Sequence, residues 1–157
     1  MSDRSAATLI IWGVTEKNVE ALTALLADWE PCHEQEVPKE LARGPLGARF
    51  YTSTALGTVV TDIGNALEAI DGVSYWISQE AHYTWDGIMR AYFPDLGRYE
   101  SLADQNGKPL IPGDRILRVA DDWLAARDPV SPLHMRLRDL CGEAWISRRE
   151  ELEEAGT

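Results

Sequence analysis

Glu80, His82 and Asp86 lie close together in the sequence and are the residues best suited to acid-base chemistry. A histidine between carboxylates is a candidate general base or metal ligand. An acidic chain, however, places carboxylates near its few histidines by chance, so a solvated loop explains the same spacing. We keep these residues as the polar part of an alternative pocket, in a small enzyme or a small-molecule-binding protein.

A second group of candidate ligands, Cys32, His33, Glu34 and Glu36, supplies residue types that bind metals. Neighbouring residues seldom direct both side chains at one ion, and the chain has no C-x-x-C spacing. It also has no G-x-S-x-G elbow, P-loop or G-x-G-x-x-G motif. We therefore expect no metal site, no cofactor and no catalysis.

The charge of the chain is strongly negative: 15 basic against 26 acidic residues give a net charge of −11. Direct nucleic-acid binding needs a basic surface, so it is disfavoured, and anionic membranes would repel the chain. An acidic surface attracts basic protein faces instead. Acidity that serves only solubility is the alternative explanation. One acidic cluster precedes and enters the predicted loop over residues 30–47, and it consists of Asp28, Glu30, Glu34, Glu36 and Glu40.

The length of 157 residues fits one domain that buries a single core without disulfides or metals. The apolar run near the N-terminus is too short for a membrane span and lacks the features of a secretory signal. We expect a cytoplasmic, single α+β domain over residues 1–157. Residues 1–7 and 153–157 are expected to be flexible ends.

The first half of the chain predicts alternating strands and helices. Residues 8–14 form an apolar run typical of a buried strand, and a helix follows Thr15. A second strand over 48–54 precedes a second helix, which Gly72 ends. We expect the two strands to pair in parallel through a right-handed crossover.

The middle of the chain is rich in aromatic residues. Seven of them fall in one stretch: Tyr75, Trp76, Tyr83, Trp85, Tyr92, Phe93 and Tyr99. Turn residues divide this stretch into predicted strands over 73–79, 85–93 and 98–103. The Asn106-Gly107 pair predicts a hairpin turn to a short edge strand over 109–111. Arg90 and Glu100, on neighbouring strands, are interpreted as a cross-strand ion pair.

The last third of the chain predicts two helices, over residues 114–128 and 131–152. The fold class is thus α+β, with a mixed sheet: β-α-β-α, then an antiparallel aromatic-rich meander, with two C-terminal helices packed on the sheet. Side chains alternate between the faces of a strand, so both faces of this sheet carry large rings. If the C-terminal helix covers the second face, the rings are core; if nothing does, they form a partner site.

We predict a non-catalytic interaction protein that binds, and inhibits or masks, a basic nucleic-acid-handling partner. Carboxylates would stand where phosphates lie, as in a nucleic-acid mimic. Immunity proteins, antitoxins and mobile-element inhibitors of host defence share this size, acidity and aromatic content, although no motif assigns a family. The partner-binding candidates are the acidic cluster with Trp76 and Trp85. A homodimer is compatible with the same features.

Overall fold

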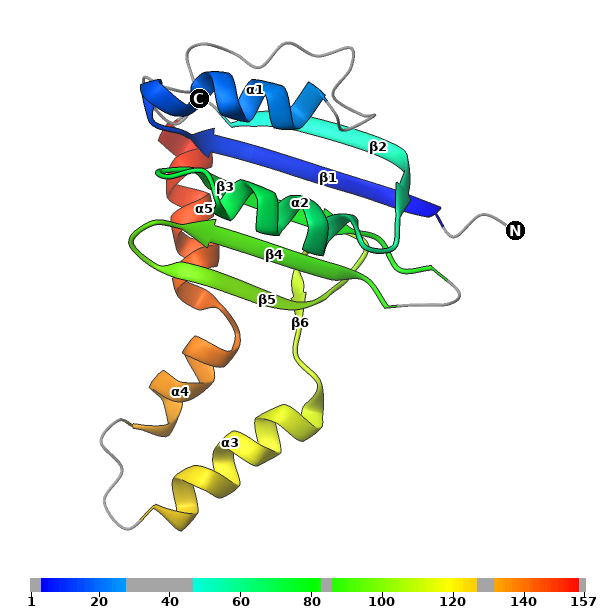
Figure 1. Cartoon of the computed structure of the whole chain (residues 1–157). Coiled ribbons are helices and arrows are strands. Elements are labelled where there is room, and N and C mark those ends of the chain that lie inside the picture. Colours follow the sequence, from blue (N-terminus) through cyan, green and yellow to red (C-terminus); the bar gives the residue numbers. More distant parts are fainter. Residues whose placement is uncertain (1–3, 28–46, 83–85, 127–131, 156–157) are drawn as a thin grey trace.

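The computed structural model describes residues 4–27, 47–82, 86–126 and 132–155 (Figure 1). These residues form one sheet in the spatial order β2-β1-β3-β4-β5-β6. Its strands are β1 (Arg4–Gly13), β2 (Ala48–Leu56), β3 (Ser74–Gln79), β4 (Ile88–Phe93), β5 (Gly97–Ala103) and β6 (Pro109–Leu110). A 3-10 turn, η1 (Glu16–Asn18), precedes the helices α1 (Val19–Ala27), α2 (Val59–Glu68), α3 (Gly113–Ala125), α4 (Leu133–Leu140) and α5 (Glu143–Ala155).

The α+β class and the β-α-β-α order of the first half are confirmed, but the mixed sheet is wrong. β1 pairs antiparallel with both β2 and β3, and every other pairing is antiparallel as well. A parallel pair requires the crossover helix to return the chain to the start of the first strand. In the structure β2 begins beside the end of β1, where Ala48 is paired with Ile11.

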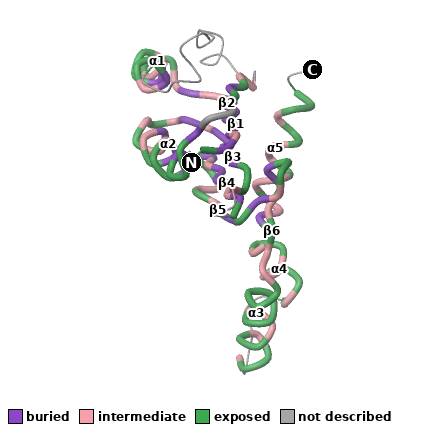
Figure 2. The backbone as a smooth tube through the Cα atoms, turned by 90° about the vertical axis from the view of Figure 1, so that its right-hand side faces the viewer, coloured by how far each residue is buried: buried purple, intermediate pink, exposed green. Residues whose placement is uncertain are grey.

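β1 lies inside the sheet, and both of its faces are covered. Leu9 and Ile11 join one buried cluster, beneath α1 and α2, while Ile10 and Trp12 join a second cluster on the opposite face. Figure 2 shows the sheet between these two layers, with α1 and α2 on one side and α5 on the other. A strand buried on both faces needs a continuous apolar run rather than an alternating one, which explains the run at residues 8–14.

α5 covers the second face of the aromatic strands. Trp145 and Ile146 of α5 pack on a cluster that includes Trp76 and Phe93, both 2% exposed. The Trp145 ring stacks on Tyr99 at 5.2 Å between centroids, and its Nε1 donates to the carbonyl of Gly97 at 3.0 Å. The aromatic side chains described here are therefore largely core residues of a sheet covered on both faces.

The Trp145 hydrogen bond gives a modest, measurable prediction. Trp145→Phe keeps an aromatic ring against Tyr99 but removes the Nε1 donor, so we expect the free energy of unfolding to fall by about 1 kcal/mol. Urea unfolding followed by circular dichroism measures this change. An unchanged midpoint would show that the bond to Gly97 contributes nothing to the docking of α5.

α5 packs on the sheet, and the end of α4 contacts it through Leu140, whose carbonyl accepts from Tyr99 of β5. The helix predicted over 114–128, α3, packs on α4 instead, which corrects the expectation that both predicted helices pack on the sheet. α3 packs against α4 and α4 against α5. The described residues 113–126 and 132–142, which we call the α3–α4 hairpin, project beyond the edge of the sheet (Figures 1 and 2). The helix predicted over 131–152 is interrupted at Gly142, whose φ of +68° lies in the left-handed region. A glycine there ends α4 and redirects the chain into α5.

The antiparallel meander is confirmed. β3, β4 and β5 pair in sequence, and the turn at Asn106-Gly107 leads into the edge strand β6. Of the ends expected to be flexible, residues 4–7 belong to β1 and residues 153–155 to α5, and the others lie outside the described residues. No helix in the described parts of the chain is long and apolar enough to cross a membrane.

Candidate interaction surface and ligand pocket

The α3–α4 hairpin carries an apolar stripe that the fold leaves open. At the helical spacing of 100° per residue, Ile116, Leu117, Val119, Ala120, Trp123 and Leu124 fall on one side of α3. The part of the stripe at Val119, Ala120 and Trp123 is half-buried. Leu117 and Leu124 are 66% and 71% exposed, and Met135 of α4 is 49% exposed. No residue of α3 is buried.

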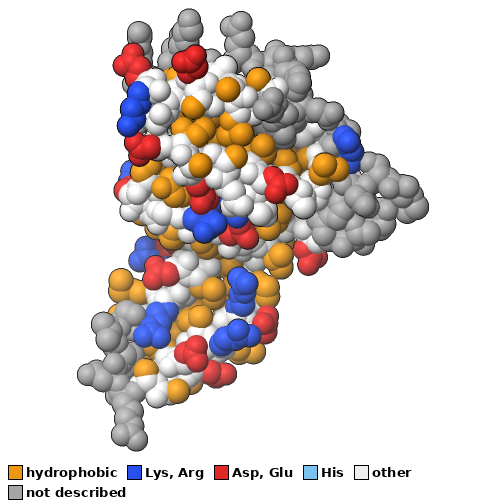
Figure 3. Space-filling view, viewed as in Figure 1, with side chains coloured by type: hydrophobic (Ala, Val, Ile, Leu, Met, Phe, Trp, Pro, Cys, Tyr) orange, Lys and Arg blue, Asp and Glu red, His pale blue; other side chains and the backbone are white. Residues whose placement is uncertain are grey.

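The charges on this hairpin balance, unlike those of the rest of the chain. Its described acidic residues are Asp114, Asp121, Asp122 and Asp139, and its described basic residues are Arg115, Arg118, Arg136 and Arg138. Figure 3 shows hydrophobic side chains with both signs of charge between them over the lower part of the molecule. An exposed apolar stripe within mixed charges is typical of a protein-binding surface.

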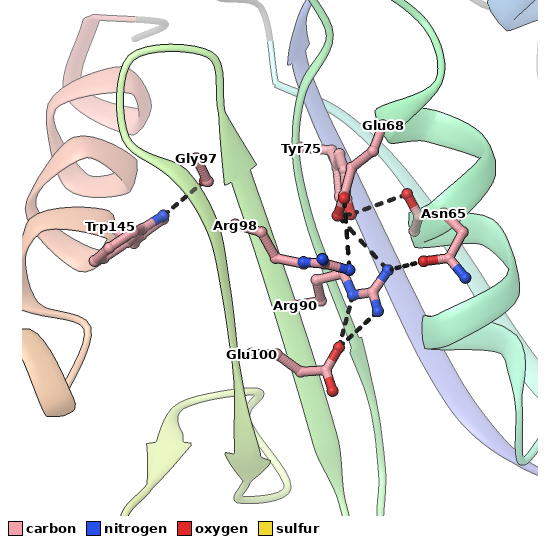
Figure 4. Close-up of polar contacts among 9 residues, drawn as sticks. Asn65, Glu68, Tyr75, Arg90, Gly97, Arg98, Glu100 and Trp145 are labelled. Atoms are coloured by element: carbon pink, nitrogen blue, oxygen red, sulfur yellow. Dashed lines mark hydrogen bonds and ion pairs between the residues drawn. The ribbon is translucent and has the colours of Figure 1, made fainter.

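On the face of the sheet that α2 covers, a polar cluster surrounds the side chain of Arg90, which is 3% exposed (Figure 4). Arg90 Nε donates to Glu100 Oε2 at 2.7 Å, and Nη1 donates to Asn65 Oδ1 at 2.8 Å. The two residues stand directly opposite each other on β4 and β5, so the predicted cross-strand pair is confirmed. Glu68 of α2 lies 3.6 Å from Arg90 Nη1.

Tyr75 completes this cluster. Its hydroxyl donates to Glu68 Oε1 at 2.8 Å, and burial together with this bond raises the pKa of Tyr75 well above its usual value. For Arg90, burial alone would lower the pKa, but the hydrogen bond and attraction of Glu100 outweigh it and the pKa is raised. Both side chains thus keep one protonation state at ordinary pH. The cluster is suited to holding α2 on the sheet rather than to proton transfer.

Of the partner-binding residues expected from the sequence, only Trp76 lies among the residues that the structure describes. Trp76 is buried under α5, with the guanidinium of Arg149 lying 4.9 Å from the centre of its ring. Its assignment as an exposed anchor is therefore corrected, because the α5 helix covers this face. Trp85 and the acidic cluster (Asp28, Glu30, Glu34, Glu36 and Glu40) lie outside the described residues.

Of the alternative pocket residues, only Glu80 lines the cavity that the structure describes here. Glu80 lines a cavity of about 170 Å³ on the face of the sheet that α5 covers, whereas His82 and Asp86 do not line it. We call this cavity the sheet-face pocket. Its lining comes from β1, β2, β3, the turn after β5 and α5, and comprises Ala6, Thr8, Ile10, Arg49, Trp76, Ser78, Gln79, Glu80, Asp104, Gln105, Asn106, Gly107 and Arg149.

Sequence reasoning missed both the open stripe of α3 and the two arginines of the sheet-face pocket. The stripe had a signal, the helical spacing of apolar residues, but this spacing was read as a surface that packs on the sheet. Arg49 and Arg149 are far apart in the sequence, and only the docking of α5 beside β2 brings them to one cavity. No local pattern contains that information.

Comparison with known proteins identifies the family of the chain. No curated protein and no solved structure in these comparisons matches it. Residues 12–157, which include only the last two residues of β1 but every later element, match the model of a family described as "Protein of unknown function (DUF3145)", and the chain belongs to that family.

Proposed function

We propose that this chain is a non-catalytic interaction protein that docks a basic partner protein on the open apolar face of the α3–α4 hairpin. One observation carries the proposal. α3 is strongly amphipathic, yet Leu117 and Leu124 remain mostly exposed on a hairpin that stands clear of the sheet. Apolar side chains at helical spacing are the anchors by which a helix fills a groove on a partner. We infer that the apolar face of the hairpin inserts into a groove of the partner protein, and that basic residues surround this groove.

Charge supports a basic partner over a second copy of the chain. The hairpin is neutral in its described residues, so the net charge of −11 is carried by the rest of the molecule. A second copy would bring the same excess of negative charge, whereas a basic rim would be attracted to the acidic body behind the hairpin. Apolar contact would supply the affinity, and charge the rate of encounter.

Basic grooves that bind nucleic acid are the surfaces that such an arrangement would mask. The hairpin would anchor in or beside the groove, and carboxylates of the body would compete with phosphates for its Lys and Arg residues. The class proposed is therefore an inhibitor or masking protein of immunity, antitoxin or anti-defence type, whose partner handles nucleic acid. The cavity beside Glu80 favours a second candidate function, the binding of a small molecule.

The experiment begins with the immobilised full chain at low salt, from which captured proteins are identified by mass spectrometry. Each candidate is then purified and its affinity measured directly. We expect a basic protein that binds the wild type, and at least about tenfold weaker binding to Leu117→Ser/Leu124→Ser, because two anchors of a helix face are lost. Affinity should fall as salt rises, and added nucleic acid should compete.

A matched control is the double variant Leu56→Ser/Leu110→Ser. Both leucines are about half exposed, on the edge strands β2 and β6, so the same apolar loss is placed away from the hairpin. The control should bind the purified partner like the wild type. Equal losses in the two variants, or a partner that is not basic, would overturn the proposal. Sedimentation of the pure chain tests the other occupant, since self-association abolished by Leu117→Ser/Leu124→Ser would assign the face to a second copy.

A further inference from the structure

The sheet-face pocket has a floor made of paired strand positions. Thr8 faces Ser78 and Ile10 faces Trp76 across β1 and β3, and the amide of Glu80 donates to the carbonyl of Ala6 at 2.8 Å. These residues lie at alternate positions, so their side chains share one face of the sheet. The turn over residues 104–107 and Arg149 of α5 form the walls.

One end of the pocket is cationic. Arg149 lies over the Trp76 ring at 4.9 Å, and Arg49 is paired with Ile10 in the register of β1 and β2. Both arginines contact Glu153 of α5, Arg149 Nε at 3.0 Å and Arg49 Nη2 at 3.9 Å. One carboxylate shared by two guanidinium groups leaves donors available to a further anion.

The same end holds a buried donor without an acceptor. Trp76 is 2% exposed, and its indole Nε1 has no hydrogen-bond partner in the described structure. A buried N–H group that lacks an acceptor costs about 1–3 kcal/mol. Trp76 lines the pocket, but its Nε1 is covered and lies beside Gly107 of the turn, so a ligand oxygen would remove that cost only where the turn gives way. The donor and the two arginines together favour a carboxylate.

The opposite end is anionic. Glu80 is exposed at the end of β3, and Asp104 stands in the turn after β5. The backbone amides of Lys108 and Asn106 donate to Asp104 Oδ1, each at 2.8 Å, and these bonds hold the pKa of Asp104 below its usual range. At about 3.4 Å per residue, Trp76 and Glu80 are separated by roughly 13 Å along β3. The hydroxyl groups of Thr8 and Ser78 lie between the two ends.

We infer that the sheet-face pocket binds a small zwitterion, an ω-amino acid with its carboxylate at Arg49, Arg149 and Trp76 and its ammonium at Glu80 and Asp104. A simple anion would use only the arginine end of the pocket, and a simple cation would use only the carboxylate end. Size agrees with this class, because a cavity of roughly 150 Å³ holds benzene and this one measures about 170 Å³.

The test is calorimetric titration of the full chain with δ-aminovalerate, valerate, pentylamine and glycine. We expect δ-aminovalerate to bind at least about tenfold more tightly than the other three, because each lacks one charge or the separation between them. No detectable binding of δ-aminovalerate at millimolar concentration would overturn the inference. Valerate that binds as tightly as δ-aminovalerate would overturn it too, since the carboxylate end would then form an anion site only.

Two variants locate the ligand within the pocket. Trp76→Phe keeps an aromatic ring and removes the indole N–H, so δ-aminovalerate and valerate should both bind about fivefold more weakly. Glu80→Gln should weaken δ-aminovalerate and leave valerate unchanged. The matched control is Asp86→Asn, because Asp86 is an exposed carboxylate outside the lining and should change neither affinity. Equal effects of Glu80→Gln and Asp86→Asn would show binding elsewhere on the acidic surface.

Discussion

Replacing Arg90 by methionine is expected to lower the free energy of unfolding by about 3 kcal/mol. The side chain is almost fully buried, and its removal leaves Asn65 Oδ1 without its donor and takes the nearer of two arginines away from the Glu68 carboxylate of α2. Methionine has a similar length and fills the space, so the loss is chiefly electrostatic rather than a cavity. Glu100 is 40% exposed and can recover water, which places the cost at the low end for buried pairs.

Arg98→Met provides the control for this prediction. Arg98 contacts the same Glu68, at 3.7 Å, but its own side chain is 51% exposed. An exposed pair contributes at most about 1 kcal/mol, so Arg98→Met should leave the urea midpoint nearly unchanged. If both variants shift the urea midpoint equally, the burial of Arg90 does not increase the contribution of its ion pairs to stability.

Gly142→Ala is expected to destabilise the chain by about 3 kcal/mol, from backbone strain and overpacking together. A Cβ at this position would stand 2.5 Å from two ring carbons of Tyr99, and φ is +68°. Tyr99 also donates to the carbonyl of Leu140 at 3.0 Å and stacks on Trp145. The added methyl group would therefore separate α5 from the sheet at the place where its docking begins. Urea unfolding, followed by tryptophan fluorescence, measures the change.

Gly97→Ala separates the two contributions. Gly97 has a φ of +77°, close to that of Gly142, but a Cβ there would meet no atom within 4 Å. It should cost only the strain of a left-handed residue, about 1–2 kcal/mol. If Gly142→Ala costs no more than Gly97→Ala, the contact with Tyr99 is not limiting and α5 docks more loosely than the structure implies.

Local sequence patterns predicted most elements because each pattern reports the local backbone. The Asn106-Gly107 turn was located correctly, since positive φ angles favour glycine wherever the chain turns. Gly72 also has a positive φ, of +76°, but α2 ends earlier, at Glu68, so Gly72 is not its cap. The cross-strand pair of Arg90 and Glu100 was also predicted, because consecutive strands joined by short turns have few registers. The direction of β2 was not, because a long connection permits either parallel or antiparallel return.

The candidate sites depended more heavily on contacts between distant segments. The alternation of side chains along β3 and β4 predicted aromatic rings on both faces of the sheet. It did not predict which segment covers the second face, and the structure shows that α5 does. Because α5 covers Trp76, this residue is buried and lines a pocket, whereas the sequence predicted an anchor for a partner. For α3, the apolar spacing was correct as a pattern but did not specify what the stripe contacts.

The sequence alone determined the α+β class, the order of the elements, the acidity that disfavours nucleic acid, and the aromatic content of the sheet. These properties depend on composition and on neighbours along the chain. Only the tertiary structure decided which rings are buried, where Arg49 and Arg149 meet, and that the stripe of α3 stays open. The physical reason is that burial is a property of pairs of surfaces. An apolar face has the same spacing whether it meets a sheet, a second helix or a partner protein.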